Sequence, residues 1–295
     1  MSNNKENSTA AWIMLISLSI VWGFSFLLIK RGLVVFSPDE VGAIRITCAG
    51  LVFMPMALPR LRKLSARQLK LLLITGAIGS LIPAFLFAKA ETGLASSLTG
   101  VLNALTPLFT IIIGFLFFST KVKRHSIIGI VVGFLGSIGL SLVNADGKLG
   151  EINYFAIYVV IATVCYAANI NMVKNYFSKL KPIEITSISL FFVGMIALVY
   201  LLGFTDTIHK LQHTKGAWTA FGYVAFLGVT GTSLALFFFN RLVQISTPVF
   251  SSSATYIIPI VAVIIGVLDG ETLVTGHYIF MLVMIFGVYI ANRKK

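Results

Sequence analysis

The sequence predicts an all-α membrane protein in which ten transmembrane helices form two inverted five-helix repeats. Of its 295 residues, 57% are hydrophobic and only 11% are charged, whereas a soluble domain carries about 25% charged residues. Ten apolar runs have the length that a bilayer requires, about 17–25 residues. The two halves of the chain also align with each other, and internal duplication in an apolar chain is typical of secondary transporters.

The duplication is visible as two constant shifts along the sequence. A shift of 144 residues pairs Trp22 with Tyr166, Ser25 with Asn169, Arg45 with Ser189, and Gly50 with Gly194. A shift of 152 pairs Gly76 with Gly228, Gly79 with Gly231, Ser80 with Thr232, Asn103 with Thr255, and Pro107 with Pro259. The larger second shift places an insertion in one loop of the second half, about residues 204–216. His209 and His213 lie four residues apart in that loop and could bind a metal on a helix, but a solvated loop is the favoured interpretation.

The apolar runs divide the chain into two domains. Residues 1–10 are polar and are predicted to be a disordered cytoplasmic tail. The first run is too long for a signal peptide and is followed by Lys30 and Arg31, so it is expected to be retained. The first repeat, 11–145, holds predicted helices at 11–29, 40–58, 69–88, 95–118 and 126–143; the second, 150–292, holds them at 152–173, 184–203, 217–239, 246–268 and 274–292.

Charge placement predicts the orientation. The formal net charge is +13, but the charges lie at the ends of the runs and form no patch for a nucleic acid, so no such partner is expected. Most of the 23 lysine and arginine residues fall on the side of the N-terminus. The positive-inside rule then places both termini in the cytoplasm of a bacterial-type inner membrane. Because each repeat has five helices, the second repeat is expected to be inverted.

Prolines and polar stripes mark the predicted binding region. Pro83, Pro107 and Pro259 lie within predicted helices, where a proline frees the carbonyl four residues before it and kinks the helix. Irregular backbone at membrane depth is tolerated where it lines a cavity, although prolines that only shape packing are the alternative. The predicted substrate-binding residues are Trp22, Ser25, Ser80, Thr99, Asn103, Thr106, Tyr166, Asn169, Thr232, Ser252, Thr255 and Tyr256. Helix–helix packing by these serine and threonine side chains is the other interpretation.

Charged residues give further expectations. Arg45 lies inside a predicted helix and is a functional candidate, or else it pairs with Asp39 or Glu40. Lys89 and Glu91 are expected to pair at the outer mouth. No acidic residue or histidine lies near the predicted midplane, so a proton relay of the usual buried kind is absent and a facilitator or weakly coupled exporter is expected.

Other site types are not predicted. The sequence has no nucleophile beside a base, no metal-binding cluster and no phosphate-binding loop, so an enzyme, a cofactor and a metal are not expected. Cys48 and Cys165 are expected to be free packing residues. Gly129, Gly133 and Gly136 form a small-residue stripe that predicts close helix packing within the monomer, with a homodimer contact as the alternative.

Several motifs resemble the EamA type of the drug/metabolite transporter superfamily. They are Trp22-Gly23-Phe24-Ser25-Phe26 with Lys30 and Pro38, Arg45 in the second helix, the region around Pro107, the stretch from Pro259 to Gly266, and Gly270-Glu271-Thr272-Leu273 followed by Gly287. The resemblance implies a ten-helix bundle with a central cavity and alternating access. The first half departs from the pattern, since Ser119-Thr120-Lys121 stands where a glutamate-containing segment is expected.

Together these features predict a transporter of small organic metabolites. Aromatic, hydroxyl and amide side chains suit a neutral or zwitterionic solute, most of all an amino acid. Multidrug efflux, flipping of a lipid-linked substrate, and a sensor without transport are the alternatives. The expected partners are the small-molecule substrate and the lipid bilayer.

Overall fold

The computed structural model describes residues 9–119, 124–143, 152–177, 179–245 and 254–292, and it is a bundle of helices. The first half contains α1 (Thr9–Gly32), α2 (Pro38–Leu61), α3 (Ala66–Gly76), η1 (Ala77–Leu81), α4 (Ile82–Ala90), α5 (Ser96–Leu102), η2 (Asn103–Leu105), α6 (Thr106–Phe118) and α7 (Arg124–Leu142). The second half contains α8 (Ala156–Tyr176), α9 (Pro182–Phe204), α10 (Thr207–His213), α11 (Ala217–Phe226), η3 (Leu227–Leu234), α12 (Ala235–Ile245), α14 (Ala254–Leu268) and α15 (Thr275–Asn292).

The helical segments match the bilayer. Within the described residues, eight segments are long and apolar enough to span a membrane, and two shorter apolar helices cover 257–268 and 275–291. Large apolar side chains are exposed on the outside of the bundle, including Phe117, Val199 and Leu282. In water such a surface would be unfavourable, so it fits a lipid-facing exterior. The chain is a multi-pass membrane protein.

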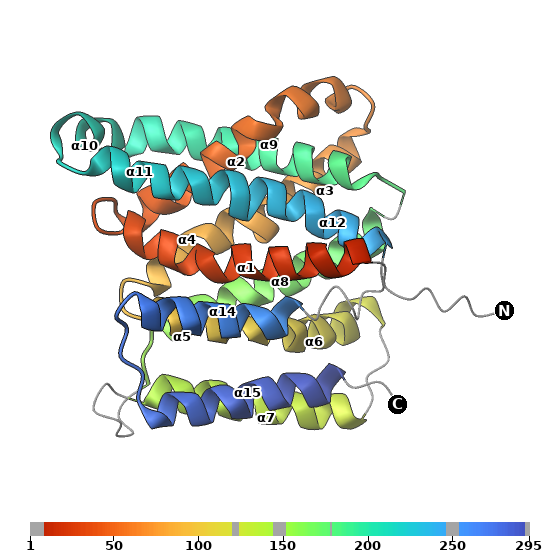
Figure 1. The fold of residues 1–295 in the computed structure, drawn as a ribbon. Coiled ribbons are helices and arrows are strands. Elements are labelled where there is room, and N and C mark those ends of the chain that lie inside the picture. The colour runs from red at the N-terminus through yellow and green to blue at the C-terminus, as the bar shows by residue number, and fades with distance from the viewer. Residues whose placement is uncertain (1–8, 120–123, 144–151, 178, 246–253, 293–295) are drawn as a thin grey trace.

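The helices lie in layers, and both ends of the described chain lie at the same end of the bundle (Figure 1). The start of α1 and the end of α15 are at one end, and α10 is at the other, which we call the α10 end. Helix α2 packs on α9, α7 packs on α15, α1 packs on α14, and α8 packs on both α4 and α6. The short helix α10 corrects the expectation of a loop over residues 204–216.

The α10 helix also places the two histidines. His209 and His213 lie one turn apart and stack with ring centroids 4.4 Å apart. No group of three or more metal-binding side chains exists among the described residues. Helix α10 carries Lys210, which forms an ion pair with Glu40 at the start of α2, at 2.5 Å. The inserted segment is therefore tied to the bundle.

Close helix contacts depend on glycine. A Cβ on Gly50 would lie 2.6 Å from the Cα of Gly194, its repeat equivalent. A Cβ on Gly129 would lie 2.5 Å from the carbonyl oxygen of Gly287, so the predicted small-residue stripe of α7 packs against α15 within the chain. Both contacts permit backbones to approach as they do in membrane helix pairs.

Two helices contain a π-helical segment at matching positions. The segment η1 lies between α3 and α4, and η3 lies between α11 and α12. A shift of 152 residues places η1 inside η3. π-Helical turns widen the backbone and occur frequently at functional sites. Both segments face the first helix of the opposite half, as described below.

Candidate functional site

The centre of the candidate site is Arg45, which lies about two turns into α2 and is buried. Its Nε donates a hydrogen bond to Oγ1 of Thr232 in η3, at 2.9 Å. The guanidinium also interacts electrostatically with the side chain of Tyr166 on α8. No ion pair joins Arg45 to a carboxylate in the described parts of the chain. A buried cation that forms no ion pair is costly, so it marks a place where an anionic group would be stabilised.

This geometry corrects the expected partners of Arg45. Glu40 hydrogen-bonds the backbone N–H of Ser37 and pairs with Lys210, so it is not available to Arg45. Asp39 is exposed at the start of α2. Because Arg45 lies deeper than either acidic residue, its partners come from the second half of the chain instead.

Aromatic side chains surround the Tyr166 side of the site. Tyr166 stacks on Phe87 with ring centroids 5.9 Å apart, and Phe87 meets Phe26 edge to face at 5.8 Å. These three residues come from α8, α4 and α1. An aromatic wall beside a buried guanidinium suits a solute with one apolar and one anionic part.

Trp22 and Ser25 meet the η3 segment from α1. The indole Nε1 of Trp22 donates to the carbonyl oxygen of Gly231 at 3.0 Å, and its ring packs edge-on against Phe239. Ser25 donates to the carbonyl oxygen of Val21 and lies against Gly231. Trp22 thus satisfies a backbone carbonyl in the π-helical segment, where the regular α-helical bonding is interrupted.

Asn169 and Ser80 form the corresponding contact in the other half. A Cβ on Gly79 would lie 2.5 Å from Nδ2 of Asn169, so the amide packs directly on η1. The Oδ1 of Asn169 is buried without a hydrogen-bond partner among the described residues. Ser80 is buried in the same π-helical segment. An unpartnered buried acceptor is available to a donor on a bound solute.

The helix that contains Pro107 has the predicted irregular backbone. A 3₁₀ turn, η2, precedes the proline and separates α5 from α6. The carbonyl oxygen of Asn103, which Pro107 leaves free, accepts a bond from Oγ1 of Thr106 at 2.8 Å. Thr106 and Thr99 are both buried, and Oγ1 of Thr99 donates to the carbonyl oxygen of Ala95. These hydroxyls bond to their own helix, whereas the Asn103 side chain is half-buried.

The other predicted residues divide into two groups. Pro83 is the second residue of α4, directly after η1, and Pro259 lies inside α14, so both occupy helices as predicted. Ser252 lies outside the described residues. Thr255 and Tyr256 lie in α14, but their side chains are outside the described part.

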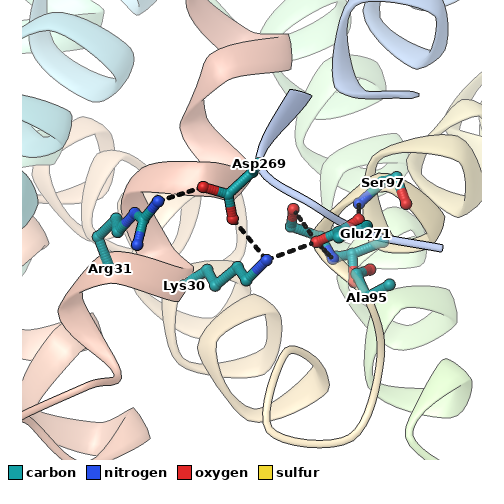
Figure 2. Close-up of polar contacts among 8 residues, drawn as sticks. Lys30, Arg31, Ala95, Ser97, Asp269 and Glu271 are labelled. Carbon is teal, nitrogen blue, oxygen red and sulfur yellow. Dashed lines mark hydrogen bonds and ion pairs between the residues drawn. The ribbon is translucent and has the colours of Figure 1, made fainter. Parts of the chain in front are cut away.

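An ion-pair cluster links the end of α1 to the turn between α14 and α15 (Figure 2). Lys30 on α1 pairs with Asp269 at 2.6 Å and with Glu271 at 3.1 Å, and Arg31 also pairs with Asp269. Both acidic residues flank Gly270, whose φ of +89° suits glycine and makes the turn between α14 and α15. The cluster therefore joins the first helix to the last two.

Glu271 also caps α5. Its carboxylate accepts the backbone N–H groups of Ser96 and Ser97, each at 3.0 Å, and the Ser96 hydroxyl at 2.7 Å. Negative charge is favourable at a helix N-terminus. Although burial opposes ionisation, these hydrogen bonds and Lys30 lower the pKa of Glu271 to about 2. The family motif includes Glu271 without giving it a role. In the structure, its carboxylate binds the start of α5 and Lys30.

The Glu271→Gln variant should therefore be less stable. The pKa of Glu271 is lower in the folded protein than its ordinary value of 4.5. The carboxylate consequently stabilises the fold above pH 4.5, by roughly 3 kcal/mol, and this contribution is lost as the pH falls toward 2. Thermal unfolding in detergent should show a lower Tm for the variant at pH 7, with the gap to wild type closing in acid. A gap that is independent of pH, or that also appears for the exposed Asp39→Asn, would contradict this assignment.

Glu91 is a functional candidate that the sequence placed wrongly. Instead of pairing with the exposed Lys89, it directs its carboxyl inward, and both of its oxygen atoms are buried. It interacts electrostatically with Lys30, Arg45 and Glu271. Nothing in its position along the sequence distinguishes it from a solvated residue at a helix end.

An apolar groove lies apart from these polar groups. It has a volume of about 360 Å³ and is lined by Leu81, Ile82, Phe85, Leu86, Ile196, Ala197 and Tyr200. These residues belong to η1, α4 and α9. Cys48 and Cys165 are free thiols, as predicted.

Comparison with known proteins gives the family. The EamA-like transporter family model matches twice, over residues 9–142 and 153–293. An Escherichia coli protein named "Uncharacterized inner membrane transporter YedA" is 26% identical over 95% of this chain and 90% of its own. An "Uncharacterized transporter" of Archaeoglobus fulgidus is 25% identical over 96% of this chain and 99% of its own.

Two further similarities concern function and fold separately. A "Probable amino-acid metabolite efflux pump" of Salmonella typhimurium is 28% identical, but over only 44% of this chain and 42% of its own. One crystal structure shares the fold with a TM-score of 0.65 over 96% of both chains, at 15% identity. Because the family model covers nearly the whole chain in two copies, this protein belongs to the EamA-like transporter family of the drug/metabolite transporter superfamily.

Proposed function

We propose that this protein exports amino acids, or closely related zwitterionic or neutral metabolites, by alternating access through a central site. The observation that carries the proposal is Arg45, a buried guanidinium that donates to Thr232, interacts with Tyr166 and forms no ion pair with a carboxylate in the described parts of the chain. A solute carboxylate would form that ion pair through the remaining N–H donors. The aromatic residues beside it would contact the solute's apolar part.

The proposed mechanism needs two inverted five-helix repeats, and contacts between the halves support that arrangement. Gly50 meets its equivalent Gly194 near the middle of both helices. Gly228 packs on the carbonyl oxygen of Arg45, and its equivalent Gly76 packs on that of Ser189. Equivalent residues make equivalent contacts across the interface, as a pseudo-two-fold axis in the membrane plane requires.

The remaining site residues have roles in the same proposal. Trp22 and Ser25 would hold η3 against α1, while Asn169 and Ser80 would hold η1 against α8. Asn103, Thr106 and Thr99 would line the path on the α5–α6 side. Each π-helical segment would provide the backbone adjustment needed when the site opens to one side and then the other.

The orientation belongs to the proposal as well. The positive-inside rule places both termini in the cytoplasm of an inner membrane, and the α10 end outside. The partial relative named as an amino-acid metabolite efflux pump supports the substrate class and the outward direction. Transport, not catalysis, is the activity proposed.

A second candidate function is the movement of an amphipathic drug or lipid-linked solute. The apolar groove beside α9 favours it, because an acyl or aromatic group would fit a surface formed by leucine, isoleucine and phenylalanine. That groove would act without Arg45, so the two candidates differ in their dependence on this residue.

Counterflow in proteoliposomes tests the main proposal. Vesicles are preloaded with an unlabelled amino-acid mixture, and uptake of each labelled amino acid is followed beside a nucleoside panel. We expect transient accumulation of one group of amino acids. No accumulation of any amino acid by folded protein would contradict the proposal and favour the amphipathic substrate.

A further inference from the structure

Glu91 is a buried carboxyl group whose oxygen atoms have no hydrogen-bond partner among the described residues. It follows the last residue of α4, at the α10 end of the bundle. Glu40, Asp269 and Glu271, the other inward acidic groups of this end, are all bonded to lysine. A bare carboxylate in this position would be strongly destabilised by burial.

The groups around Glu91 come from three elements. Lys30 on α1 and Arg45 on α2 are cationic, and Glu271 in the α14–α15 turn is anionic. Lys30 already pairs with Asp269 and Glu271, and within the described chain no ion pair joins Glu91 to either cation. Burial and the Glu271 charge raise the pKa of Glu91 well above its ordinary value, although the two cations oppose this. Glu91 is therefore protonated more readily here than a carboxyl group in water.

Arg45 and Glu91 together form an unusual pair. Their charges interact, yet the two side chains are not in direct contact as an ion pair. A zwitterion carries a carboxylate and an ammonium group a few ångströms apart. Such a solute can place its carboxylate on the guanidinium and its ammonium group on the Glu91 carboxylate. Each of the two side chains then gains an ion-pair partner.

We propose that Glu91 holds either a proton or the ammonium group of the solute whose carboxylate binds Arg45. This inference rests on the proposed function and adds that export of the solute is coupled to entry of a proton. When a solute enters from the cytoplasm, its ammonium group replaces the proton, and the Glu91 carboxyl releases that proton to the cytoplasmic water. After the solute leaves outside, a proton from the external water binds the emptied carboxylate. One solute moves out for each proton that moves in.

Coupling of this kind differs from the facilitator or weakly coupled exporter expected from the sequence. That expectation depended on the absence of acidic residues near the midplane, whereas Glu91 is brought to the site by the fold from the end of its helix. The proton and the ammonium group compete for one carboxylate. Each therefore lowers the affinity of Glu91 for the other, and the two are not carried together.

Calorimetric titration of purified protein between pH 5 and pH 8 tests the competition. The probes are the amino acid that counterflow ranks first and its desamino carboxylate. Below the pKa of Glu91, the apparent Kd of the amino acid should rise about tenfold per pH unit, as competition with one proton requires. The desamino carboxylate should weaken by less than about twofold over this range, because only its own carboxyl group begins to protonate near pH 5. Glu91→Gln should bind the amino acid more weakly and without this pH dependence.

A pH indicator inside proteoliposomes gives the second readout. An outward amino-acid gradient should acidify the lumen through the wild type and through Asp39→Asn, an exposed carboxyl at the same end, but not through Glu91→Gln. Flat amino-acid binding across pH in the wild type, or solute-driven proton flux retained by Glu91→Gln, would overturn the inference. Wild-type protein that binds no amino acid at any pH would instead overturn the proposed function on which it rests.

Discussion

Gly50→Leu is expected to prevent the two halves of the bundle from packing. A Cβ at this position would lie 2.6 Å from the Cα of Gly194 and 2.7 Å from the carbonyl oxygen of Leu190, so the clash is with backbone that cannot rotate away. Overpacking a close interface costs about 1–3 kcal/mol or more. The measurement is the monodisperse yield and the Tm in detergent, both of which should fall sharply.

The chain provides a matched control for this substitution. Gly222 on α11 has no atom within 4 Å of an added Cβ, and it faces outward. Gly222→Leu should therefore keep the wild-type yield and Tm, while Gly194→Leu should fail as Gly50→Leu does. Normal assembly of Gly50→Leu would show that α2 and α9 do not meet at these residues.

Arg45→Gln is expected to abolish most amino-acid transport without unfolding the protein. Glutamine can still donate to Thr232, and the loss of a buried charge removes a desolvation cost. A charge-assisted hydrogen bond to the solute carboxylate contributes about 1.5–3 kcal/mol, so the apparent affinity should fall roughly 10- to 100-fold. Counterflow at several solute concentrations measures this, with Tm as the control for folding. Arg45→Lys should recover part of the activity, because it keeps the charge but loses the planar donor pair.

Much of the fold could be predicted because the bilayer restricts the possible elements. Each of the ten predicted runs contains helix where the structure describes it, although the run predicted to begin at 152 becomes helical only at Ala156. Sequence rules missed α10, since a seven-residue helix tied down by Lys210 and Glu40 depends on a tertiary contact. Those rules locate the prolines but do not predict the π-helical segments η1 and η3. These segments contact Asn169, Trp22 and Ser25, which are far away in the sequence.

The site was harder to predict than the fold. Polar residues that recur in both repeats could be found by alignment of the halves, and Trp22, Tyr166, Asn169 and Thr232 were found that way. Arg45 and Glu91 have no acidic or basic counterpart in the second repeat, so repetition gave no support to their roles. Their importance depends on which neighbours neutralise them, and that is decided by distances between helices far apart in sequence.

Binding of the solute carboxylate by Arg45 can be tested directly by exchanging one functional group of the solute. Counterflow inhibition is measured with the best amino acid and with its carboxamide, which has nearly the same shape but no negative charge, for the wild type and Arg45→Gln. In the wild type the carboxamide should inhibit at least about tenfold more weakly, whereas in Arg45→Gln the two compounds should differ by less than about twofold. An equal loss in both proteins would show that the carboxylate binds elsewhere.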